Sequence, residues 1–129
     1  MKYIFRIRFL LLLSIIVVNN ANAQLEEPVK WKFASTKITD CEYELQFTGT
    51  IDKHWHVYSL TLPGDDGPLP SKINFQKSNV YELIGTTTEG NPIKSYDSVF
   101  KMNVAYFEKT VIFKQKIKLK ADKEIVIKG

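Results

Sequence analysis

Apolar and polar positions alternate along most of the chain after residue 28. Val29, Trp31 and Phe33 alternate with two lysines, and this period of two predicts a half-buried strand whose lysines point outward. Longer segments with the same period cover residues 43–51 and 111–119. The second of these carries lysine at most of its polar positions, a pattern that protects exposed strands from edge-to-edge pairing.

Shorter apolar segments extend the pattern, and turn-forming residues separate them. No segment shows a sustained period of 3.6 residues, so we expect no helix in the folded part of the chain. The number and spacing of the strands predict an all-β protein, an immunoglobulin-like antiparallel β-sandwich. The shorter predicted strands are residues 56–60, 72–75, 80–87, 100–106 and 125–128.

The first 23 residues are typical of a cleaved signal peptide. Three basic residues precede an apolar run at 9–18, and Ala21-Asn22-Ala23 supplies a small-residue cleavage site. Ten apolar residues are too few to span a bilayer, which takes roughly 20, so we expect no stable membrane anchor. The sequence therefore predicts an exported protein whose residues 24–129 form one domain.

Removing the signal peptide changes the charge of the protein. Residues 24–129 contain 15 lysines, no arginine and 14 acidic residues, a net charge of +1. Nucleic-acid-binding domains usually carry a basic, arginine-rich patch. We therefore expect no nucleic-acid partner.

The two histidines, His54 and His56, would share one face of a strand and could bind zinc or copper together. Structural zinc sites take four protein ligands and catalytic sites take three, so Cys41 or a carboxylate would have to complete the set. Ordinary strand packing is the alternative interpretation, and we expect no metal.

One cysteine and two aspartates could also be chemically active residues, but each has a purely structural explanation. Cys41 has acidic neighbours, which raise a thiol's pKa, so we expect a packed side chain rather than a nucleophile. Asp65 and Asp66 lie between glycines, where solvated turn residues are expected. Because the chain has no nucleophile elbow, phosphate-binding loop or dinucleotide motif, we expect no cofactor.

Tyr96 and Phe100 flank a short polar stretch in a region rich in turn-forming residues. Loops on a rigid sandwich often carry function, so these aromatic side chains could form a contact surface. The alternative is that they hold the loop against the sheet.

Taken in order, these segments resemble the N-terminal periplasmic domain of the DsbD family of thiol:disulfide interchange proteins, in its Bacteroidetes form. No single motif is diagnostic, but the ordered set covers nearly all of residues 24–129. The matching segments are residues 28–33, 43–48, 50–52, 55–59, 67–70, 81–85, 96–100, 104–108 and 113–119.

The resemblance implies a periplasmic sandwich that relays reducing equivalents from a membrane electron-donor domain to thioredoxin-like partners, as in cytochrome maturation. It also implies a cap loop, which corresponds here to Tyr96, Asp97, Val99 and Phe100. The family's better-known members have adjacent aromatics followed by glycine at the cap, whereas Lys101 follows Phe100 here.

The family's cysteine pair follows the strand that residues 125–128 would form, beyond Gly129, and Cys41 does not match it. The resemblance therefore also implies that the sandwich lacks its last strands in this chain. Thiol–disulfide exchange needs an attacking and a resolving sulfur. We therefore expect no catalytic residues and no reductase activity in this chain alone. The alternative is an exported immunoglobulin-like module that binds a protein without catalysis.

Overall fold

The computed structural model describes residues 25–120 and 125–128, so the predicted signal peptide and its cleavage site lie outside the described residues. Within those ranges the chain contains no helix long and apolar enough to cross a membrane. The described part is built from seven strands: β1 (Val29–Lys37), β2 (Glu42–Ile51), β3 (Val57–Tyr58), β4 (Tyr81–Glu89), β5 (Ile93–Asp97), β6 (Met102–Phe107) and β7 (Thr110–Leu119).

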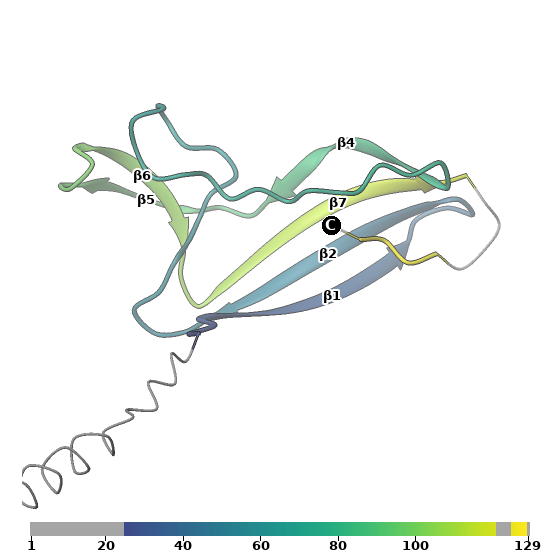
Figure 1. Ribbon diagram of the computed structural model, residues 1–129, viewed down its shortest axis with the longest axis horizontal. Coiled ribbons are helices and arrows are strands. Elements are labelled where there is room, and N and C mark those ends of the chain that lie inside the picture. Colours follow the sequence, from purple (N-terminus) through teal and green to yellow (C-terminus); the bar gives the residue numbers. More distant parts are fainter. Residues whose placement is uncertain (1–24, 121–124, 129) are drawn as a thin grey trace, which may run out of the picture.

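The strands form two antiparallel sheets (Figure 1). The larger sheet has the order β1-β2-β7-β4, and the smaller has the order β3-β6-β5. The β5–β6 hairpin extends past the end of the larger sheet, on the opposite side from the β1–β2 turn (Figure 1). The prediction of an all-β, sandwich-like antiparallel fold is confirmed.

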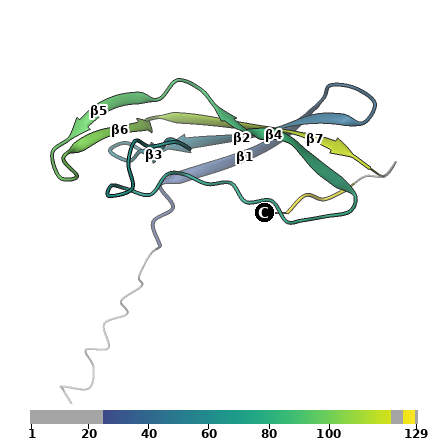
Figure 2. The ribbon, with the colours of Figure 1, turned by 90° about the horizontal axis from the view of Figure 1, so that it is seen from above.

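The hydrophobic core lies on one face of the larger sheet. Val111, Phe113 and Ile117 of β7 are at most 2% exposed, and Phe107 of β6 packs edge-on against Phe113. The chain between β3 and β4 runs across this face (Figure 2), where Phe75 makes an edge-to-face contact with Phe47 of β2. Much of the covering layer is therefore extended chain without a hydrogen-bonded ladder.

The lysine-rich strand β7 is an interior strand, paired with β2 on one side and β4 on the other. The interpretation of its lysines as protection for an exposed edge was therefore wrong. Glutamates on the neighbouring strands balance them: Lys114 lies 3.1 Å from Glu44, and Lys118 is opposite both Glu42 and Glu82. The lysine row forms the solvent face of a central strand.

Several predicted strand boundaries were wrong. Residues 56–60 form only the two-residue β3, and residues 72–75 and 125–128 belong to no strand. The last two segments still meet, because the Gln76 amide donates to the Lys128 carbonyl at 3.0 Å. Strand β5 was not predicted, although it pairs with β6 along its whole length.

Strand β4 contains an irregularity that a buried glutamine accounts for. Its register against β7 shifts between Ile84 and Thr88, and Gly85 there has a φ of 66°. Gln115 of β7 is 2% exposed, and its amide nitrogen donates to the carbonyls of Ile84 at 3.1 Å and of Lys116 at 2.8 Å. Its oxygen accepts a hydrogen bond of 2.9 Å from the Thr87 hydroxyl. The bulge therefore satisfies a polar side chain within the core.

Candidate functional site

Three exposed apolar side chains lie close together in the sequence at the tip of the β5–β6 hairpin. Asp97 and Met102 are the last paired residues, so residues 98–101 form the turn. The exposed fractions are 82% for Val99, 63% for Tyr96 and 40% for Phe100. We call Tyr96, Asp97, Val99 and Phe100 the hairpin tip.

Asp97 fixes the shape of the turn. Its Oδ1 accepts hydrogen bonds from the backbone amides of Val99 at 2.8 Å and of Phe100 at 3.1 Å. An aspartate that binds backbone amides two and three residues ahead stabilises a turn locally. The exposed apolar side chains of the hairpin tip are therefore carried on an ordered turn. Of the two aromatic residues for which both interpretations were open, Tyr96 is the more exposed at 63%, which suits a contact surface, whereas Phe100 at 40% is compatible with either interpretation.

A glycine-containing loop, here called the bracing loop, packs against the hairpin beside its tip. A Cβ atom on Gly67 would lie 2.3 Å from the Met102 Sδ, so a larger residue there would require the Met102 side chain to move. Asp65 and Asp66 of the same loop are exposed to solvent. Leu69, also in this loop, is 87% exposed.

An aromatic cluster lies beside the hairpin on the smaller sheet. The His56 ring packs against Tyr58 and Tyr106, with centroid distances of 4.8 and 5.1 Å. Partial burial, and then the negative charge of Asp97, raise the pKa of Tyr58 above its ordinary value. These contacts join the hairpin to β3 and give His56 a packing role.

The predicted strand geometry of the histidine pair was wrong. His54 has a φ of 72° in a turn, and the strand begins only at Val57. The two side chains therefore do not share a strand face. In the described ranges 25–120 and 125–128, no group of three or more His, Cys, Asp and Glu residues could hold a metal ion.

Cys41 lies at the opposite end of the larger sheet from the hairpin tip. It is a partly buried free thiol immediately before β2, and its carbonyl accepts a hydrogen bond of 2.7 Å from the Leu119 amide. The ten residues of β2 separate it from the end that carries the hairpin, a distance of about 30 Å. Cys41 and the hairpin tip therefore form no common site.

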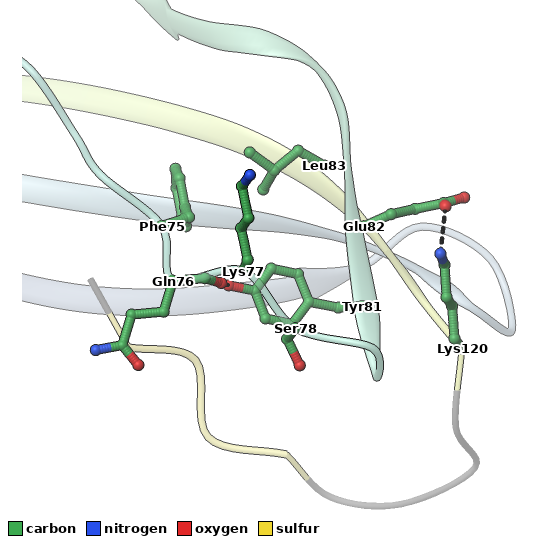
Figure 3. A pocket seen from close by; sticks show the side chains of 8 residues that line it. All are labelled: Phe75, Gln76, Lys77, Ser78, Tyr81, Glu82, Leu83 and Lys120. Carbon is green, nitrogen blue, oxygen red and sulfur yellow. Dashed lines mark hydrogen bonds and ion pairs between the residues drawn. The ribbon is translucent and has the colours of Figure 1, made fainter.

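A second candidate site is a pocket of about 310 Å³ beside the start of β4 (Figure 3). Phe75, Tyr81 and Leu83 supply apolar groups, the Lys77 side chain extends between Phe75 and Leu83, and Lys120 lies to one side, next to Glu82 (Figure 3). Lys120 lies 2.8 Å from Glu82, and this hydrogen-bonded ion pair lowers the pKa of the Glu82 carboxyl. The pocket was not predicted, because its residues come from the extended segment before β4, from β4 itself and from the end of β7, which only the fold brings together.

Two hydroxyl groups of this pocket are engaged in structural contacts. The Tyr81 hydroxyl donates to the Gln76 carbonyl, and the Ser78 hydroxyl accepts from the Val80 amide at 3.2 Å. Among the described lining residues, no nucleophile is paired with a general base.

Comparison with models of protein families, with curated proteins and with solved structures finds no match to this chain.

Proposed function

We propose that this protein is a periplasmic docking domain without catalytic activity of its own. In this proposal the hairpin tip binds a thioredoxin-like protein of a disulfide-reducing pathway, as the sequence resemblance implies. Export and a periplasmic location are part of the same proposal, since the sequence of residues 1–23 is typical of a signal peptide.

The observation that carries the proposal is the exposed apolar tip held by Asp97. Val99 is 82% exposed although its own backbone amide is fixed by the Asp97 carboxylate. A preordered apolar group loses little conformational entropy when a partner covers it, so such groups make effective contacts. The exposed Leu69 on the bracing loop enlarges the apolar surface at this end of the molecule.

A docking role rather than a redox role is favoured by the position of the single thiol. Cys41 is about 30 Å from the hairpin end of the sheet, so a partner bound at the tip would not reach it. Exchange through a mixed disulfide also needs a second sulfur to resolve it, and the chain has one cysteine. The more general alternative is an exported module that binds some other protein, and this module would also bind through the hairpin tip.

Titration calorimetry with the periplasmic thioredoxin-like proteins encoded in the same genome tests this proposal. We expect one of them to bind, and Val99→Asp to weaken that binding by roughly tenfold or more, because a charge is placed in the apolar contact. Val126→Asp is a matched control, since Val126 is also 82% exposed but lies far from the hairpin in the chain. The purified protein should not accelerate insulin reduction by dithiothreitol.

Binding by none of these proteins, or equal loss of binding in both variants, would contradict the proposal. Binding of a protein without a thioredoxin-like fold, with the same sensitivity to Val99→Asp, would support the general module instead.

A further inference from the structure

Burial decreases from β7 through β2 to β1 along a row of phenylalanines. Phe33, Phe47 and Phe113 are opposite one another on β1, β2 and β7. Phe113 is 1% exposed and Phe47 is partly buried, whereas Phe33 is 72% exposed although its ring packs edge-on against Phe47. This row of phenylalanines therefore ends in solvent at the edge strand.

The edge formed by β1 is long and regular. All nine residues of β1 pair with β2 without a register shift, and no strand of the described residues pairs with its other side. The opposite edge, β4, is interrupted by the bulge between Ile84 and Thr88, which hinders pairing with another chain. Of the two edges of the larger sheet in the described residues, β1 is therefore the one with an uninterrupted set of free backbone donors and acceptors.

We propose that β1 pairs with β1 of a second copy of this protein, in an antiparallel two-fold arrangement centred on Phe33. A two-fold axis normal to the sheet keeps the core faces of both copies on the same side, so each residue pairs with one of equal parity. The register that pairs all nine residues places Phe33 opposite Phe33 and Trp31 opposite Ser35. The phenylalanine row then continues into the second copy.

The charges on β1 are compatible with this register and with few others. Lys30 would lie opposite Thr36, Lys32 opposite Ala34 and Lys37 opposite Val29, so no lysine faces a lysine. A shift that centres the axis on Lys32 would place like charges directly opposite each other, which is destabilising. The lysines of β1 thus disfavour some other registers of pairing, and they are compatible with the one register in which all nine residues of both strands pair.

Sedimentation of the purified protein over a wide concentration range tests the proposal. We expect a reversible monomer–dimer equilibrium. Phe33→Lys should abolish the dimer, because it places two charges at the axis, and it should leave the melting temperature of the monomer nearly unchanged, because Phe33 is mostly exposed. Tyr96→Lys is the control: it alters an exposed aromatic at the hairpin tip and should leave the dimer intact.

Cysteine cross-linking tests the register separately from the affinity. In a background in which Cys41 is replaced by serine, Phe33→Cys should form an intermolecular disulfide, because directly opposite residues have Cα atoms about 4.5–5.5 Å apart. Ser35→Cys should not cross-link, because its counterpart would be displaced by four residues, about 14 Å away. Equal cross-linking of the two variants would overturn the proposed register.

A protein that remains monomeric at all concentrations, with no cross-link through Phe33→Cys, would overturn the proposal and leave the β1 edge open to a strand of another protein. The partner-binding experiment with Val99→Asp is independent, because the hairpin tip and the β1 edge are separate surfaces.

Discussion

At the scale of single residues, close packing makes some positions much less tolerant than their chemistry suggests. Gly49 of β2 is buried, and a Cβ atom there would lie 2.9 Å from both the Trp31 ring and the Val111 side chain. Trp31 in turn stacks on Phe113 with a centroid distance of 6.1 Å. The Trp31 ring can therefore pack over Gly49 only because this residue has no side chain.

Gly49→Ala should therefore lower the free energy of unfolding by about 1–3 kcal/mol, because the added methyl group overpacks a filled core. Gly90→Ala is the matched control, since nothing lies within 4 Å of a Cβ at that position, and its effect should be within about 0.5 kcal/mol. Urea denaturation followed by tryptophan fluorescence gives both values. Equal stability of the two variants would show that Trp31 does not pack as described.

The ion pair between Glu82 and Lys120 predicts a specific pH response. The hydrogen bond from Lys120, then its charge, lower the pKa of Glu82, and Lys118 makes a smaller contribution. A carboxyl whose pKa is lower in the folded state stabilises the fold above its unfolded pKa, and the stabilisation is lost as the pH falls through the folded pKa.

Lys120→Met should return the pKa of Glu82 toward its ordinary value, as measured by an NMR titration of its carboxyl carbon. Lys116→Met, which removes a charge from β7 opposite Glu44 and Ile84, should leave this pKa nearly unchanged. The two variants would behave alike if the pKa reflected only the general positive charge of β7.

At the scale of elements, the sequence pattern located all four strands of the larger sheet, including β4 at the predicted 80–87, but could not identify every pairing. Alternation at 29–33, 43–51 and 111–119 marked β1, β2 and β7, because one face of each strand lies on or beside the core. Alternation indicates which side chains are buried, however, and not whether the backbone pairs with another strand. Residues 72–75 show this, because they alternate and cover the core but form no strand hydrogen bonds. Strand β5 is the converse case, because it belongs to a sheet although its sequence shows no pattern of burial. Four of its five residues are exposed, and backbone pairing with β6 holds it in place.

The bulge in β4 depends on an interaction that no local pattern contains. Replacing Gln115 by leucine should lower the free energy of unfolding by about 1–3 kcal/mol, because it leaves the Thr87 hydroxyl and the Ile84 carbonyl without this partner. Gln46→Leu, at a glutamine whose side chain donates only to Thr48, should cost less than about 1 kcal/mol. Thermal unfolding distinguishes the two, and equal losses would rule out this role for Gln115.

The hairpin tip could be located in the sequence, but its rigidity could not. Its residues were singled out from their aromatic character and from the resemblance, whereas the two hydrogen bonds to Asp97 depend on the turn geometry. Asp97→Ala should speed hydrogen exchange of the Val99 and Phe100 amides and cost about 0.5–1 kcal/mol. Asp97→Asn retains an acceptor oxygen and should protect these amides.

Both substitutions at Asp97 should lower the pKa of Tyr58, because each removes the negative charge that helps to raise it. A tyrosine whose pKa is raised in the folded state stabilises the fold below the unfolded pKa of about 10, and this is lost as the pH rises through the folded pKa. Loss of amide protection in Asp97→Asn, with no change at Tyr58, would contradict both assignments.

At the scale of the whole molecule, the fold separates two kinds of surface. The hairpin tip projects beyond one end of the larger sheet, while the single thiol lies near the other end and the unpaired β1 edge runs between them (Figure 1). A protein that docked at the tip would leave β1 free, so a two-fold dimer would present two tips. This arrangement suits recognition of two partner molecules at once.

The most direct test of docking at the tip is an NMR titration of the isotopically labelled protein with the thioredoxin-like partner that binds it. We expect the largest changes in amide chemical shift at residues 96–100, with smaller changes in the bracing loop around Leu69 and none near Cys41. Changes concentrated near Cys41, or on the solvent face of β7, with the amides of residues 96–100 unaffected, would contradict the account.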